Sequence, residues 1–303
     1  MGRKAKALFV AAIAAVISIA IGAAIIMLTG IWGAEGSMIA RIGVLVLMIV
    51  IWFVLIWLFG RIDHNSDAKK DPVTPEQQRY LAFAAPMFMR NADTLHTFDF
   101  LSGTKKQIIK VLRDWWGIED EQSTIETLEL LTVGGNHTDF ADSVFIDIIK
   151  AGHSTPLSLD ALNDIDGFED ADESILEEIN AAADSYDFLK KQLVRSIKLT
   201  EEELLEISTL AAWDYGRAGF IARYSANAGY ISRDTAWEYM KIAADNAAVP
   251  YSSWRQYFIA YYIGRAIAYG ETGEEHVDDL KDILRTKGGK YDIFDNISFK
   301  GDK

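Results

Sequence analysis

The residues best suited to chemistry form an ordered set of acidic, basic and aromatic side chains in the C-terminal half of the chain. Asp214 and Arg217 are three residues apart, which places both on one helical face where they can pair. An arginine-rich pocket could bind a carboxylate or phosphate group. The residues of this candidate polar pocket are Asp214, Arg217, Arg223, Tyr230 and Arg265.

The same residues can instead form a structural clasp. Trp213, Trp237 and Trp254 fall on three consecutive expected helices, and we expect them in the core with acceptors for their indole N–H groups. Buried charges must be paired, and such pairs fix one arrangement of helices. Because no base or nucleophile accompanies the ion pair, we favour the clasp and predict no catalytic residue.

Other catalytic and cofactor motifs are absent from the sequence. It has no cysteine, which excludes disulfides, thiolate nucleophiles and cysteine-ligated metals. It also lacks the nucleotide-binding and nucleophile-elbow glycine motifs, so we expect no cofactor. The five histidines show no HExxH spacing, and we expect loop or surface positions for all of them: His64, His96, His137, His153 and His276.

A strongly acidic stretch lies between Ala151 and Leu189, with 11 Asp or Glu and no Lys or Arg. Within it, Asp164, Asp166 and Glu173 match part of a calcium-binding loop, but Leu162 occupies the first ligand position and cannot ligate. We therefore predict no metal site. The stretch is typical of a solvated surface, or of a docking surface for a basic protein partner.

The N-terminal region has a different composition from the rest of the 303 residues. The net charge is -14, yet residues 1–60 carry +3, which leaves -17 for residues 61–303. Two uncharged apolar runs, at about 8–29 and 42–60, approach the roughly 20 residues of a membrane-spanning helix. We predict a two-helix transmembrane hairpin. The acidic remainder argues against nucleic acid as a partner.

Basic residues precede the first apolar run and follow the second, and they predict the orientation of the hairpin. The positive-inside bias places the N-terminus and the C-terminal domain in the cytoplasm, at a bacterial inner membrane. The residues concerned are Arg3, Lys4, Lys6, Arg61, Lys69 and Lys70. Small residues in the first run favour close helix packing within the hairpin, and the alternative is an oligomer interface.

Residues 61–74 are polar and predict a linker, followed by an acidic helical domain over residues 75–303. Capping boxes predict helix starts at Thr74, Ser123 and Thr200. Residues 156–167 are typical of a loop, and 291–299 of a strand or an ordered extension. The expected helices span about 75–91, 104–116, 123–134, 139–149, 172–198, 200–227, 232–249, 253–270 and 274–285. With no βαβ alternation, the fold class is all-α.

An ordered series of short motifs resembles a known family. The series runs from Trp116-Gly117-Ile118 through Trp213-Asp214-Tyr215-Gly216-Arg217, Gly229-Tyr230-Ile231 and Ser253-Trp254 to Gly264-Arg265. It resembles the bacterial domain-of-unknown-function family 1266 (YbeU/YbeR-like) over about residues 116–270. The resemblance implies a helical domain, no established activity, and a binding or immunity-type role.

The sequence thus favours a membrane-anchored, non-enzymatic protein-binding module, an adaptor or immunity-type protein, that presents an acidic helical domain at the cytoplasmic face. Its expected partners are the lipid bilayer and a protein that is basic. One alternative is an enzyme that uses the Asp/Arg pocket. A second alternative is an oligomeric channel or pore subunit built on the first apolar run.

Overall fold

The computed structural model describes residues 71–90, 94–99, 104–135, 137–270, 274–284 and 297–301, together with Val46, Ile49, Val50 and Phe53. The chain divides into two compact units, Met1–Pro72 with Leu101–Thr104, and Val73–Phe100 with Lys105–Lys303. The predicted membrane spans therefore fall almost wholly outside the described residues. Within the described part of the chain, no helix is both long enough and apolar enough to cross a bilayer.

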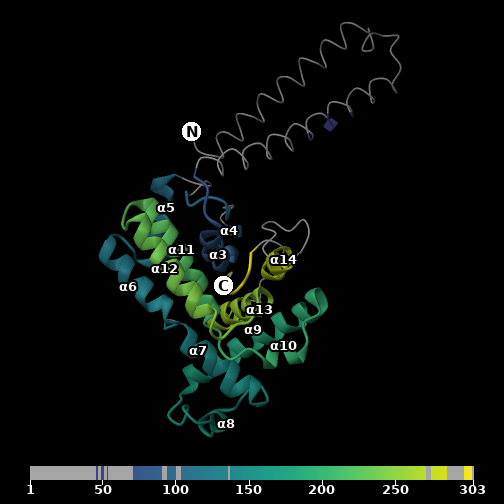
Figure 1. The fold of residues 1–303 in the computed structure, drawn as a ribbon. Helices are drawn as coiled ribbons and strands as arrows, with labels where there is room; N and C mark the ends of the chain where they lie inside the picture. The colour runs from purple at the N-terminus through teal and green to yellow at the C-terminus, as the bar shows by residue number, and fades with distance from the viewer. Residues whose placement is uncertain are drawn as a thin grey trace, which may run out of the picture. The chain divides into compact units, whose positions relative to one another are not determined.

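The second unit is all-α, as predicted, and no strand occurs among its described residues (Figure 1). Its helices are α3 (Pro75–Phe83), α4 (Ala85–Arg90), α5 (Lys105–Trp116), α6 (Glu121–Thr132), α7 (Thr138–Asp142), the π-helix η1 (Ser143–Lys150), α8 (Leu159–Asn163), α9 (Glu173–Ile197), α10 (Glu201–Leu205), α11 (Ala212–Ala228), α12 (Arg233–Ala247), α13 (Trp254–Tyr269) and α14 (Glu274–Ile283).

Local sequence determines most helix ends. The predicted capping box at Thr74 is present, because its hydroxyl accepts from the Gln77 N–H while the Gln77 side chain accepts from the Thr74 N–H. Asp172 and Ser232 cap α9 and α12 as their types predict, and of the two adjacent serines that could cap α13, Ser252 and Ser253, the second is the N-cap. α11 and α13 each end at a glycine in the left-handed conformation, Gly229 and Gly270.

One predicted capping box is wrong. Helix α6 begins two residues before Ser123, with Asp120 as its N-cap, and Ser123 is the third residue of the helix. The Asp120 carboxylate accepts from the Ser123 N–H, and the Ser123 hydroxyl accepts from the Asp120 N–H. An aspartate caps as well as a serine, so the pattern alone allowed two starts.

The single helix predicted over residues 200–227 is also wrong, because residues 206–211 separate α10 from α11. Asp142 accepts hydrogen bonds from the Thr209 hydroxyl, at 2.6 Å, and the Leu210 N–H, at 2.5 Å. Lys150 donates to the carbonyl oxygens of Leu205 and Ile207. These contacts from the α7–η1 segment satisfy backbone groups that a continuous helix would have paired internally.

The predicted 139–149 helix forms as α7 followed by η1, in which the hydrogen-bond spacing widens to that of a π-helix. The predicted 156–167 loop contains the short helix α8, which Ser158 caps through the Ala161 N–H. A five-residue helix is too short for a periodicity argument to detect. The loop before α8 is fixed to α9, where Asn180 exchanges two hydrogen bonds with the Leu157 backbone.

Helix α11 is the centre of the unit and is buried along almost its whole length, against α5, α6, α12 and α13. Such a position requires a helix without a polar face. Close approach to α13 depends on glycine. A Cβ atom at Gly216 would lie 2.5 Å from the Tyr261 ring, and one at Gly264 would lie 3.0 Å from the Leu210 carbonyl oxygen.

The C-terminal segment packs on α3 and α13. Arg79 Nε donates to the Phe299 carbonyl oxygen at 2.7 Å, and Trp254 Nε1 donates to that of Ile297 at 2.7 Å. Residues 297–301 are non-helical, so of the two predicted forms, a strand or an ordered extension, this part adopts the extension. Residues 291–296 of that prediction lie outside the described part.

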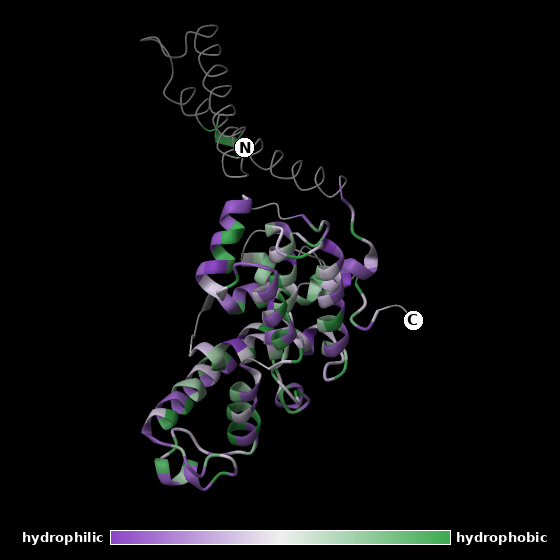
Figure 2. Ribbon diagram, turned by 90° about the vertical axis from the view of Figure 1, so that its left-hand side faces the viewer, coloured by the Kyte–Doolittle hydropathy of each residue, from purple (hydrophilic) through white to green (hydrophobic). Residues whose placement is uncertain are grey.

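A projection of the unit carries the acidic stretch. η1 packs against α9, with the Phe145 and Tyr186 ring centroids 5.6 Å apart, and α8 also contacts α9. In Figure 1, α8 lies at the lower end of the unit and α5 at its upper end. Figure 2 shows the projection extending below the rest of the helices, with polar residues (purple) along its outer sides. We call residues 151–189 the acidic arm.

Candidate functional site

The predicted Asp214–Arg217 ion pair is present and lies inside the protein. Both residues are in the first turns of α11, and the Arg217 Nη2 donates to the Asp214 Oδ1. The second carboxylate oxygen accepts from the Thr138 hydroxyl at 2.8 Å. Asp214 is 0% exposed and Arg217 is 1% exposed, so solvent does not reach the pair.

The environment of Arg217 is aromatic. Its guanidinium carbon lies 4.9 Å from the Trp213 ring centroid and 5.8 Å from that of Trp116. Burial lowers the pKa of Arg217 to about 10, which leaves it protonated at neutral pH. Two donors in this cluster, Arg217 Nε and Trp213 Nε1, have no hydrogen-bond partner among the described residues. The Trp254 indole N–H has the acceptor that we predict, the Ile297 carbonyl oxygen, whereas no described residue accepts from that of Trp213.

Arg265 joins this cluster from α13. Its guanidinium carbon lies 5.8 Å from the ring centroids of Trp213 and Tyr269, and its Nη1 contacts the Nε2 of His276. His276 is 4% exposed, which contradicts its predicted loop or surface position. The reason is its place in α14, whose inner face covers α13 and α9.

Arg223 lies outside the Asp214–Arg217 cluster and contacts a different part of the fold. It is 0% exposed and donates to four carbonyl oxygens of one loop, those of Thr94, Thr97, Phe98 and Asp99, at 2.9 to 3.1 Å. The guanidinium N–H groups therefore satisfy carbonyl oxygens that backbone N–H groups would satisfy in a helix or sheet. Arg223 holds this loop against α11 and does not contribute to a common pocket with Asp214.

Tyr230 and Trp237 also lie apart from the ion pair. Tyr230 is half-buried in the turn after Gly229, where its N–H donates to the Ser225 carbonyl oxygen. Trp237 is half-buried against Phe98, with ring centroids 4.8 Å apart. The prediction of a core Trp237 is therefore wrong, while Trp213 and Trp254 are in the core. Of the five predicted pocket residues, the fold brings together Asp214, Arg217 and Arg265.

Two residues at the edge of the cluster were not predicted. His137 is half-buried, and burial, together with the charge of Arg217, lowers the pKa of its imidazole. Tyr269 is 51% exposed, and its ring lies 5.8 Å from His137 and 5.8 Å from Trp213, centroid to centroid. Nothing in their local sequence links residue 137 to residue 269, because only the packing of α7 beside α13 joins them.

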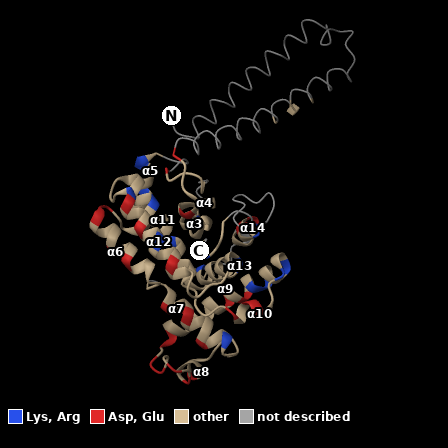
Figure 3. Cartoon of the chain, in the orientation of Figure 1, with Lys and Arg blue, Asp and Glu red and all other residues tan. Residues whose placement is uncertain are grey.

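The acidic arm presents every one of its carboxylates to solvent. All 11 are exposed, and none forms an ion pair within the described residues. Figure 3 shows the acidic residues (red) gathered around α8, with Lys and Arg (blue) on α5 at the other end of the unit. Asp164 follows α8, Asp166 lies in the next turn, and Glu173 begins α9. Across the described part of the chain, no acidic or histidine cluster is arranged to hold a metal ion.

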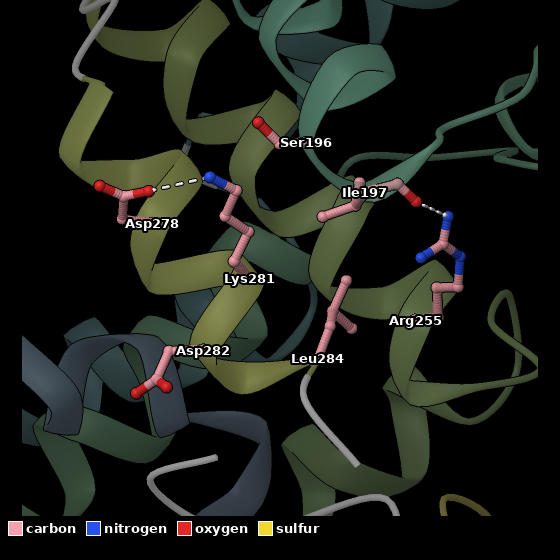
Figure 4. A pocket seen from close by; sticks show the side chains of 7 residues that line it. All are labelled: Ser196, Ile197, Arg255, Asp278, Lys281, Asp282 and Leu284. Carbon is pink, nitrogen blue, oxygen red and sulfur yellow. Dashed lines mark hydrogen bonds and ion pairs between the residues drawn. The ribbon is translucent and has the colours of Figure 1, made fainter. Parts of the chain in front are cut away.

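A cavity of about 620 Å³ lies between α9, α13 and α14, and none of the predicted pocket residues is in its lining (Figure 4). Its walls carry Arg255, Asp278, Lys281 and Asp282. Arg255 is held by Glu203 and by the Ile197 carbonyl oxygen, and Lys281 pairs with Asp278 at 3.2 Å. Arg255 and Lys281 are thus already paired, and Asp282 adds a further negative charge, so the walls carry both signs and do not favour one ligand charge.

The geometry defines an all-α domain whose buried charges hold helices and loops together. The sequence matches the model of a family described as "Protein of unknown function (DUF1266)" over residues 111–292. The chain therefore belongs to this family, as the motif series from Trp116 to Arg265 indicated. The match extends beyond the predicted 116–270 at both ends.

A curated relative is the uncharacterised protein YbeR of Escherichia coli (strain K12), which is 35% identical over 92 residues. The matched segment covers 30% of this chain and 37% of YbeR. No solved structure matches the chain significantly.

Proposed function

We propose that this protein is a membrane-anchored, non-enzymatic binding module, an adaptor or immunity-type protein, whose acidic arm docks a basic protein partner. The observation that carries the proposal is that all 11 arm carboxylates are exposed and that none pairs with a cation of a described residue. Such a surface attracts a basic partner over several ångströms and speeds its association.

The rigidity of the arm supports this role. Asn180 and the Leu157 backbone tie its loop to α9, and Asp172 caps α9 through two N–H groups. The arm is thus an ordered surface that keeps its charges in fixed positions. A fixed charge pattern selects among basic partners better than a flexible acidic tail does, since less ordering is needed on binding.

The anchor is proposed from the apolar runs at 8–29 and 42–60. Val46, Ile49, Val50 and Phe53 follow the i, i+3, i+4, i+7 spacing of one helical face, are helical, and are each more than half exposed. An exposed apolar face of this kind needs a lipid or protein environment. The basic residues on either side favour a two-pass anchor in a bacterial inner membrane with both ends in the cytoplasm.

An enzyme built on the predicted Asp/Arg pocket is less well supported. Asp214, Arg217 and Arg223 are sealed from solvent, and Arg223 serves a different part of the fold. A substrate would have to displace the contacts that hold α11 in place. The pore alternative rests on residues 8–29, which lie outside the described part.

The docking role is tested by charge neutralisation. We choose four arm acids whose side chains make no hydrogen bond with a described residue: D164N, D166N, D170N and E177Q. The control removes four exposed acids elsewhere: E119Q, E121Q, E126Q and E129Q. In pulldowns from a detergent extract, the full-length arm variant should lose a partner that the control variant retains. Equal binding by both variants would contradict the role of the arm.

The anchor is tested by protease accessibility. A protease added outside intact spheroplasts should leave residues 75–303 uncut, and it should digest them once the membrane is opened. Digestion in intact spheroplasts would reverse the predicted orientation. A full-length chain that stays in solution without lipid or detergent would remove the anchor altogether.

A further inference from the structure

Helix α5 is the most positively charged of the described helices, in a unit that is acidic overall. Its 12 residues carry three lysines, one arginine and one aspartate, for a net charge of +3. Lys106, Lys110 and Arg113 follow the i, i+4, i+7 spacing of one stripe, and all three are exposed. We call this stripe the basic face of α5.

Within the described part of the domain, one residue of this face forms an ion pair. The opposite side of α5, with Ile108 and Leu112, is buried against the core and holds the helix in place. Arg113 pairs with its neighbour Asp114 at 2.8 Å, whereas Lys106 and Lys110 form no ion pair with a described residue. A surface held rigidly and charged oppositely to the rest of the unit is suited to a polyanion.

We propose that the basic face of α5 rests on the anionic headgroups of the membrane that anchors the chain, so that the acidic arm points into the cytoplasm. The inference rests on the proposed anchor. Only ten residues separate Gly60 from Asp71, a distance of at most about 40 Å when extended, so the unit remains close to the bilayer.

Charge complementarity favours this orientation. An anionic leaflet attracts juxtamembrane lysines and arginines and repels clustered carboxylates. α5 and α8, at the end of the arm, lie at opposite ends of the unit (Figure 3). The negative potential of the leaflet therefore attracts one end of the unit and repels the other, and both effects favour the same orientation. Nucleic acid, the other abundant polyanion, would be repelled by the remaining acidic surface of the same unit.

The inference is tested with the full-length chain in lipid nanodiscs, of phosphatidylcholine alone or with phosphatidylglycerol. Because the chain has no cysteine, a single donor dye is placed by Q107C on α5 or by A161C on the arm. Energy transfer to acceptor-labelled headgroups reports proximity. With phosphatidylglycerol, transfer from position 107 should rise and fall again at high salt, while transfer from position 161 stays low.

The double variant K106E/K110E should abolish the phosphatidylglycerol-dependent rise at position 107. The matched control, K191E/R195E, makes the same charge change at two exposed positions of α9 and should keep it. Indifference of position 107 to lipid charge, approach of position 161, or equal effects of both variants would each overturn the inference. So would binding of duplex DNA, in discs of phosphatidylcholine alone, that depends on Lys106 and Lys110 while the lipid response does not.

Failure of the anchor is distinguishable from failure of this inference. A chain without an anchor leaves the discs as free protein. Its flotation with phosphatidylglycerol vesicles then tests α5 directly, and it should depend on Lys106 and Lys110 and not on Lys191 and Arg195. An anchored chain whose label at position 107 ignores lipid charge keeps the anchor and loses the α5 contact.

Discussion

The centre of α11 and the acidic arm use the same residue types in opposite ways. At the centre, Asp214 and Arg217 are excluded from water and joined to each other. On the arm, carboxylates such as Asp164 and Asp166 are exposed and form no ion pair with a described residue. A buried charge is costly until it is paired, so it is kept where it fixes the fold. An exposed charge costs little, so it is available for a partner.

This difference separates structure from function within one domain. Residues with the types expected of an active site serve as internal supports, while the functional surface is proposed where single residues contribute little to stability. Breaking a buried pair and removing an exposed charge should therefore differ several-fold in their effect on the free energy of unfolding.

The largest effect is expected for D214A. It leaves the Arg217 guanidinium buried without its carboxylate, and we expect a loss of about 3–5 kcal/mol in the free energy of unfolding. Urea unfolding of the full-length chain in detergent, followed by circular dichroism, measures it. The control D214A/R217M removes both charges and should recover much of the loss. A small effect of the single change, below about 1 kcal/mol, would mean that the pair is not the clasp we describe.

A smaller loss, about 3 kcal/mol, is expected for R223A, because four loop carbonyl oxygens lose their donor. Limited proteolysis at Phe98 should accelerate as the loop is released. Arg233 is the control, since it is exposed and its guanidinium carbon lies 4.5 Å from the Phe98 ring. R233A should cost about 0.5–1 kcal/mol. Equal effects of the two changes would remove the special role of Arg223.

His137 lies between the two extremes, and its effect depends on pH. Because burial and Arg217 lower its pKa below the usual 6.5, the unfolded chain binds a proton at this residue at a higher pH than the folded chain does. Its contribution to stability is thus full above about pH 6.5 and is lost as the pH falls. In urea unfolding from about pH 7 to about pH 5, H137Q should flatten part of the decline. The exposed His153 provides the control, and an equal flattening by H153Q would contradict the assignment.

The smallest effect is expected on the arm. D164N/D166N removes two exposed carboxylates that form no hydrogen bond with a described residue, and the free energy of unfolding should stay within about 0.5 kcal/mol of the parent. The midpoint of urea unfolding, at low and at high salt, measures this. A loss comparable to that of D214A would show that the arm carboxylates support the fold and are not free for a partner.

Much of the fold could be predicted from the sequence because its signals are local. Thr74, Asp172, Ser232 and Ser253 cap helices wherever they precede a helical run, and the all-α class follows from the same short-range patterns. The break after Leu205 could not be predicted, since Asp142 and Lys150 supply its hydrogen bonds from more than 50 residues away. The start of α6 could not be predicted either, because Asp120 and Ser123 are both good N-cap residues.

The sequence alone determined the ion pair, because a three-residue spacing on a helix brings Asp214 and Arg217 together in any fold that keeps the helix. It also determined the family motifs. The sequence also determined which stretch would be acidic. Only the tertiary structure decided which charges are buried and which are exposed. In the folded protein, Arg223 donates to the loop at residues 94–99, His276 contacts Arg265, and the arm carboxylates are exposed to solvent. Burial depends on contacts between helices distant in the chain, and no local pattern encodes those contacts.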